Sequence, residues 1–215
     1  MGLFRTPDQS NPYLPPIGEA GGPPTMLGRT SADETPGNWR IEMRYLPILH
    51  RGHAFLALVG PDGDEKQLHG RSQSINTGKI VSMGMDNAKL VSPADNDKDC
   101  WMTRNTIPIG RVATGSRAEM EAIWARGKQA ADEVNRRNLD YKADDLSYEL
   151  GGNGGQIQNS NAFNYTIGKA MGLDLTGAVQ SAGLNRVFPG WGRDLLDPAY
   201  KPYVTPPDRS PNFPP

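Results

Sequence analysis

One serine of the sequence stands at the start of an apolar helical pattern. Ser160 is the middle residue of the triplet Asn159-Ser160-Asn161, directly before apolar residues at helical spacing. A serine in the first turn of a helix lies near the positive end of the helix dipole, where unpaired backbone N–H groups can stabilise an oxyanion. Such a nucleophile needs a base within hydrogen-bond reach, usually a histidine held by a third polar group. These residue types allow attack on an acyl carbonyl.

The order of the candidate residues along the chain restricts the type of site. His50, His53 and His69 all precede residue 70, whereas Cys100 and Ser160 follow it. Only an order with the histidine first and the nucleophile later is therefore open. The acidic residues directly before Cys100 disfavour a thiolate, so we do not expect Cys100 to be a nucleophile.

Each of these residues also has an ordinary structural explanation. Serine and asparagine are preferred N-cap residues, so Ser160 can be a helix cap and nothing more. His53, on an apolar strand, can be a buried histidine of the core, and His69 an ordinary strand residue. His50 is expected in a solvated loop. The histidines have no carboxylate at metal-ligand spacing, and the glycine run at 151–155 lacks the Lys-Ser or Lys-Thr of a phosphate-binding loop, so we expect no metal and no cofactor.

Composition limits the classes of partner. The chain has 215 residues, a formal net charge of −1 and 36% hydrophobic residues, which fits one globular domain. No basic stripe with interleaved aromatic residues marks a nucleic-acid surface, so nucleic acid is not an expected partner. The sequence also predicts no signal peptide and no integral membrane span, which leaves the cytoplasm and signal-independent export both open. "MGLFRT" fits the short pattern for acylation at Gly2, and the sequence leaves that modification undecided.

Proline and glycine content divides the chain into three parts. Residues 1–37 form a Pro/Gly-rich N-terminal arm, residues 38–204 the domain, and residues 205–215 a Pro-rich tail. We expect the two ends to lack a core of their own. The arm is a candidate segment for binding a protein partner.

The domain is expected to be α+β, with a small antiparallel sheet packed against helices. Strands are expected in a meander over 39–49, 53–60 and 65–73, with weaker strand patterns at 79–83 and 106–113. The second of these is apolar on both faces, which predicts a central strand. Helices are expected over 116–138 and from about residue 160 onward.

Both expected helices have an apolar stripe. Ser116 and Glu119 have capping-box spacing at the start of the first helix. Its stripe consists of Met120, Ile123, Trp124, Ala131 and Val134, and that of the second helix of Phe163, Ile167, Ala170 and Met171. Since Ser160 lies three residues before Phe163, it is expected on the buried side of its helix.

Three short motifs together resemble a known group of enzymes. The motifs are "HAFLALVGPDG" from His53, "LHG" around His69 and "NSNAF" around Ser160. They resemble circularly permuted relatives of the NlpC-type papain-like peptidases, a group that includes the lecithin:retinol acyltransferase family. There a histidine opens a strand, a second polar residue follows on the next strand, and a helix begins much later with an N-C-x-x-F nucleophile motif. The resemblance covers roughly residues 40–197 and implies a papain-like fold.

The resemblance implies a role for each matched residue. His53 would be the base, His69 its orienting partner, and Ser160 would stand where these enzymes usually have cysteine. The chain is also similar to bacterial domains in which an N-S-N-x-F motif precedes a Pro-x-x-x-G-x-D segment, here "FPGWGRDLL" at 188–196. A site shaped for cysteine does not automatically work with serine, so an adapted site and an inactive one are both open.

The expected function is a hydrolase or acyltransferase that cleaves an ester or amide, with lipid or peptide as substrate. The resemblance favours lipid esters, and a compact domain with Pro/Gly-rich ends and no signal peptide would suit a bacterial effector. Two alternatives stay open: an amidase or peptidase acting on cell-wall peptides, and a non-catalytic binding or structural module of the same fold.

Overall fold

The structure is a computed structural model that describes residues 38–48, 50–81, 88–93, 106–143 and 156–205. The arm at 1–37, nearly all of the tail, Cys100 and the glycine run at 151–155 lie outside the described residues. The predictions made for them therefore stay predictions.

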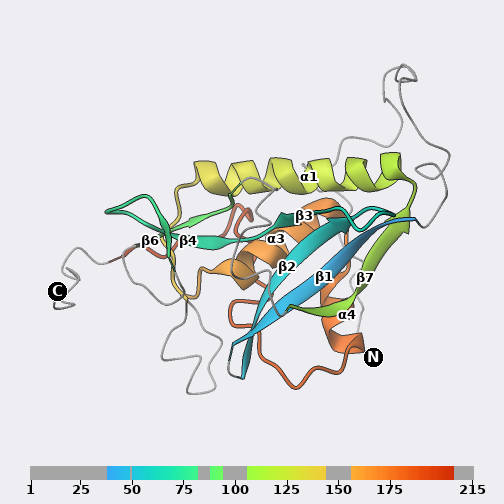
Figure 1. The fold of residues 1–215 in the computed structure, drawn as a ribbon. Helices are drawn as coiled ribbons and strands as arrows, with labels where there is room; N and C mark the ends of the chain where they lie inside the picture. The colour runs from blue at the N-terminus through green and yellow to red at the C-terminus, as the bar shows by residue number, and fades with distance from the viewer. Residues whose placement is uncertain (1–37, 49, 82–87, 94–105, 144–155, 206–215) are drawn as a thin grey trace, which may run out of the picture.

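The first sheet has four antiparallel strands in the order β3-β2-β1-β7 (Figure 1). Its strands are β1 (Trp39–Ile48), β2 (Arg51–Val59), β3 (Glu65–Leu68) and β7 (Ile107–Gly115). The expected meander is present, and β2 is an inner strand as its apolar residues predicted. Alternate residues of β2 serve two faces: Ala54, Leu56 and Leu58 join the main core, whereas Phe55, Ala57 and Val59 form a separate buried cluster.

The expected third strand at 65–73 is in fact two strands that belong to different sheets. β3 ends at Leu68, and β4 (Arg71–Ser74) pairs instead with β5 (Ile80–Val81) and β6 (Ala88–Val91) in a second antiparallel sheet. Gly70 lies at the break, where a Cβ atom would come within 2.5 Å of Cβ of Phe163. The chain passes so close to a helix at this point that only glycine fits.

Three helices are present among the described residues: α1 (Arg117–Arg136), α3 (Ser160–Met171) and α4 (Leu175–Ser181). The predicted capping box of Ser116 and Glu119 begins α1. Of the predicted stripe, Met120, Trp124, Ala131 and Val134 are buried, and Ile123 is half-buried.

Helix α3 is the most buried helix: ten of its twelve residues are buried. It packs closely on α1, where a Cβ atom at Gly127 would lie 2.7 Å from Sδ of Met171. Its predicted stripe of Phe163, Ile167, Ala170 and Met171 is buried in the main core. Gly172, with φ of 78°, ends the helix in the left-handed conformation that glycine tolerates.

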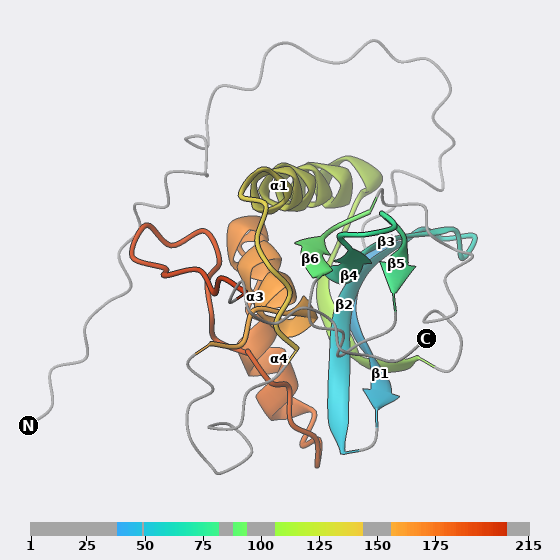
Figure 2. The ribbon, with the colours of Figure 1, turned by 90° about the vertical axis from the view of Figure 1, so that its left-hand side faces the viewer.

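Figures 1 and 2 show that α1 lies across one end of the domain and that α3 and α4 lie on one side of β1 and β2. The architecture is thus α+β, with two small antiparallel sheets and helices packed against them. None of the described helices is long and apolar enough to cross a membrane.

Candidate active site

Asn159, and not Ser160, caps the helix that carries the candidate nucleophile. The side-chain oxygen of Asn159 accepts hydrogen bonds from the backbone N–H groups of Asn161 (2.9 Å) and Ala162 (3.2 Å). Ser160 is the first residue of α3. The capping explanation for Ser160 is therefore wrong: Asn159 already satisfies the N–H groups that a cap would bind, and the Ser160 hydroxyl is left for another partner.

Asn161 joins the start of α3 to the edge of β2. On that side, Val187 bridges Arg51 and accepts from the N–H of Gly52 (2.9 Å), and β3 pairs with β2 only from Leu56 onward, so the edge between Gly52 and Leu56 has no strand neighbour. The Asn161 carboxamide takes the place of a strand there: its oxygen accepts from the N–H of Ala54 (2.9 Å) and its NH2 donates to the carbonyl of Gly52 (2.9 Å). It also donates to the carbonyl of Pro189 (3.1 Å). These bonds fix the first turn of α3 next to His53.

His53 and Ser160 form the central contact of the site. His53 lies on β2 opposite Leu46 of β1, and its Nδ1 is 2.8 Å from Oγ of Ser160. Both side chains are almost fully buried, at 2% and 3% exposure. The distance is that of a hydrogen bond between a nucleophile and its base.

His69 holds the other side of the His53 ring, as expected. Its Nδ1 is 3.5 Å from Nε2 of His53, and its own Nε2 is 2.6 Å from the side-chain oxygen of Gln67. The ring of His69 also stacks on Phe55, with centroids 4.3 Å apart. The structure thus brings His53, His69 and Ser160 together, while their catalytic roles stay a prediction.

A chain of hydrogen bonds fixes which nitrogen of each imidazole carries the hydrogen. The Gln67 amide donates to the carboxylate of Glu65, which in turn is paired with Arg44 at 2.8 Å. An ionised carboxylate only accepts, so the Gln67 oxygen must face His69 and accept from its Nε2–H. Nδ1 of His69 is then the acceptor for Nε2–H of His53. What remains on His53 is the lone pair of Nδ1, directed at the Ser160 hydroxyl.

Burial and a nearby cation keep both imidazoles neutral. Burial, followed by the positive charge of Arg71, lowers the pKa of His53 to about 4. Burial and the charges of His53 and Arg71 hold the pKa of His69 well below its usual value. At neutral pH His53 is therefore an uncharged imidazole with a free lone pair, the form that a general base needs.

Tyr141 is a further residue at the nucleophile. Tyr141 is buried, and its hydroxyl interacts with the side chain and backbone of Ser160. Burial raises the pKa of Tyr141, and the proximity of Ser160 offsets this rise in part, so the phenol keeps its hydrogen at neutral pH. The phenol O–H is a donor next to the atom where an oxyanion would form.

Only one of these additional residues had a signal in the sequence. Gln67 lies two positions before His69, a spacing that places strand residues on one face, whereas Arg71 lies beyond the break at Gly70, in β4. Tyr141 precedes Ser160 by a long connection, and no pattern linked them. His50 is exposed, as expected for a loop residue. Within the described part of the chain, no group of three or more His, Cys, Asp or Glu residues is placed to hold a metal ion.

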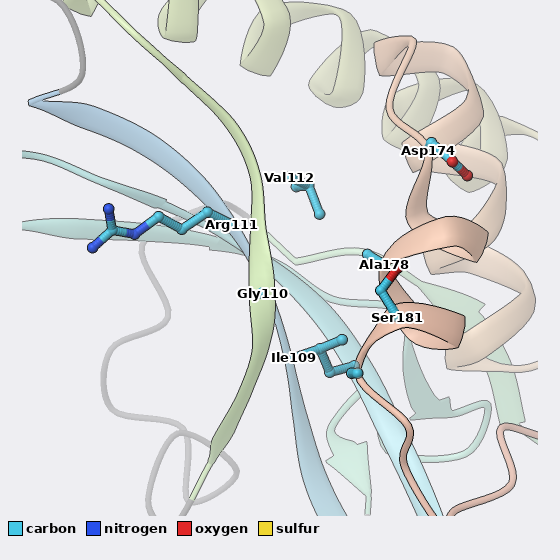
Figure 3. Close-up of a pocket in the computed structure, with 8 residues that line it drawn as sticks. Ile109, Gly110, Arg111, Val112, Asp174, Ala178 and Ser181 are labelled. Atoms are coloured by element: carbon cyan, nitrogen blue, oxygen red, sulfur yellow. The ribbon is translucent and has the colours of Figure 1, made fainter.

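A shallow groove lies elsewhere, between β7 and α4 (Figure 3). Ile109, Val112 and Ala178 are among its lining residues. His53, His69 and Ser160 do not line it. The groove is therefore separate from the candidate site.

Comparison of the chain with models of known protein families, with curated proteins and with solved structures gave no significant match. The functional interpretation consequently depends on the geometry of the site.

The lowered pKa of His53 predicts a pH-dependent stability. In the unfolded chain His53 has its ordinary pKa of 6.5, whereas in the folded protein its pKa is about 4. As the pH falls below 6.5, the unfolded chain therefore binds a proton that the folded protein does not bind, and the free energy of unfolding decreases. The decrease begins at pH 6.5 and is complete near pH 4. The size of this loss is about 3 kcal/mol. Urea unfolding at pH 7 and pH 4 measures it, with His53→Leu as the variant that lacks the titrating group. An equal fall in wild type and His53→Leu would contradict a buried, neutral His53.

Proposed function

We propose that the protein is a hydrolase or acyltransferase that cleaves an ester or amide through a Ser160 nucleophile and a His53 base. The single observation that carries the proposal is the 2.8 Å contact between Nδ1 of His53 and Oγ of Ser160, with the far side of the same ring held by His69. A neutral histidine with a fixed tautomer beside a serine at a helix start is the arrangement that nucleophilic acyl transfer needs.

The proposed reaction begins with proton transfer from the Ser160 hydroxyl to Nδ1 of His53. As the O–H bond breaks, Oγ forms a bond to the acyl carbon and the carbonyl electron pair moves onto its oxygen. The donors proposed for that oxyanion are the backbone N–H of Ser160 and the hydroxyl of Tyr141, and the charge of Arg71 favours it electrostatically. The tetrahedral intermediate then expels its leaving group, which takes the proton from His53. Water or another acceptor releases the acyl group from Ser160 by the same steps in reverse.

The papain-like fold of permuted NlpC type belongs to this proposal. Two features support it. The proposed nucleophile Ser160 begins helix α3, which packs on an antiparallel sheet, and the proposed base His53 lies on β2 of that sheet, with His69 directly after β3. Lipid esters as substrates come from the resemblance alone, and a role as a bacterial effector is suggested by a compact hydrolase domain with Pro/Gly-rich ends and no predicted signal peptide. Cell-wall peptides are the alternative within the same chemistry.

One observation favours a non-catalytic module instead. Ser160 and His53 are 3% and 2% exposed, so a substrate reaches them only if covering residues move. In such a module the contact between the two side chains would only join α3 to β2. The difference between the two functions is whether Ser160 reacts.

The reactivity of Ser160 is the direct test. We expect a fluorophosphonate probe to label Ser160. Because Ser160 and His53 act as a unit, either Ser160→Ala or His53→Ala should abolish both the labelling and the turnover of a panel of esters and amides. Labelling should be constant from neutral pH down to about 5 and should fall near pH 4, where His53 gains a proton. Mass spectrometry of the labelled peptide identifies the modified residue.

Ser160→Cys provides a second readout that needs no substrate. A thiol in this position should be alkylated by iodoacetamide faster than Cys100, because the adjacent base favours the thiolate. Absence of labelling in wild type, together with alkylation of Cys100 and the new thiol at equal rates, would show that the contact is structural.

Tyr141→Phe tests the oxyanion donor. Removing the hydroxyl should lower kcat by about 10²-fold with little change in KM, since the bond strengthens only as the oxyanion forms. Steady-state kinetics measures the split. Tyr200→Phe is the matched control, because Tyr200 is a tyrosine whose hydroxyl bonds to Gln158 and not to Ser160. A rise in KM alone would show that Tyr141 contributes to binding and not to the transition state.

A further inference from the structure

Asn164 is a buried amide without a hydrogen-bond partner, one turn after Ser160 on α3. Its side chain is 1% exposed, and neither the oxygen nor the nitrogen of its carboxamide has a partner among the described residues. The other two asparagines of this helix start differ from it. The carboxamides of Asn159 and Asn161 bond through both their oxygen and their nitrogen.

Helix geometry places the Asn164 carboxamide beside the nucleophile. Residues four apart lie on one face of a helix, and side chains tilt toward the N-terminus. Asn164 therefore shares the face of α3 on which Ser160 lies. It adds a donor and an acceptor to the helix start, where backbone N–H groups already converge.

The protein gains no stability from this amide as it stands. A buried polar group left unpaired carries its full desolvation penalty, and an apolar side chain of similar size would avoid it. The neighbouring Phe163 and Ile167 are apolar core residues of the same helix. The missing partners of Asn164 are thus to be sought in what binds next to Ser160.

We propose that Asn164 is a specificity-determining residue that binds an amide group of the substrate next to the scissile acyl group. A carboxamide offers one C=O acceptor and N–H donors, and a substrate amide offers the complementary N–H and C=O, so both partners are satisfied together. The straight acyl chain of a lipid would leave Asn164 unpaired. The substrate class is therefore a peptide or N-acylamino acid derivative, an inference that rests on the proposed function.

Two p-nitrophenyl esters of similar length test this preference. The N-acetylglycine ester carries an amide beside the scissile carbonyl, whereas the pentanoate ester has only methylene groups there. The measured quantity is the ratio of kcat/KM for the two esters, each divided by its uncatalysed rate. We expect Asn164→Leu to lower this ratio by about tenfold or more, since a site that loses its hydrogen-bonding group loses its preference for the polar substrate.

Ile167→Leu is the matched control, an apolar change of similar size on the same helix, and it should keep the wild-type ratio. The melting temperature of Asn164→Leu should rise, because the unpaired amide is removed. An unchanged ratio, an equal loss of activity on both esters, or a lower melting temperature would each overturn the inference.

Binding separates this inference from the proposed function. Saturation-transfer NMR of N-acetylglycinamide is measured on Ser160→Ala and on the same protein with Asn164→Leu added. If wild type hydrolyses neither ester and Ser160 is unlabelled, the proposed function fails, yet weaker binding of N-acetylglycinamide after Asn164→Leu would still support Asn164 as the residue that binds an amide group. Binding that is absent, or that Asn164→Leu does not change, would overturn it even where Ser160 is labelled.

Discussion

The candidate site depends on Asn161, which docks the first turn of α3 against the edge of β2 between Gly52 and Leu56. Its carboxamide supplies the acceptor and the donor that a neighbouring strand would otherwise give to Ala54 and Gly52. Buried backbone groups must be paired, so this bond set leaves little freedom for the helix start. The adjacent residue, Ser160, is thereby held within 2.8 Å of a ring that projects from the same strand.

A second constraint runs through the other side of His53. The carboxylate of Glu65 accepts from Gln67, which orients the amide that faces His69, and His69 in turn orients His53. The pair of Glu65 with Arg44 links this polar chain to β1. Burial and Arg71 keep both rings uncharged. The position of the hydrogen on His53 and the neutral charge of this ring are thus set by residues other than Ser160.

Much of this arrangement was predictable from local sequence, and the rest depends on tertiary contacts. The apolar residues on both faces of β2 and the apolar stripes of α1 and α3 predicted these elements, because those residues are buried in the core. The break after His69 was not predictable, since it results from the close approach of Gly70 to Phe163. Likewise Asn159 and Ser160 are both good cap residues, and only the backbone decides between them. The proximity of Tyr141 to Ser160 had no sequence signal.

The state of the His53 ring tests the central claim most directly. Nitrogen-15 NMR of the imidazoles, assigned with a His53→Gln variant, distinguishes a nitrogen that carries a hydrogen from one with a free lone pair. At pH 7 we expect His53 to be neutral, with the hydrogen on Nε2 and the lone pair on Nδ1, since the chain from Glu65 permits only this tautomer. A charged ring, or a hydrogen on Nδ1 at that pH, would contradict a His53 poised to take the proton of Ser160.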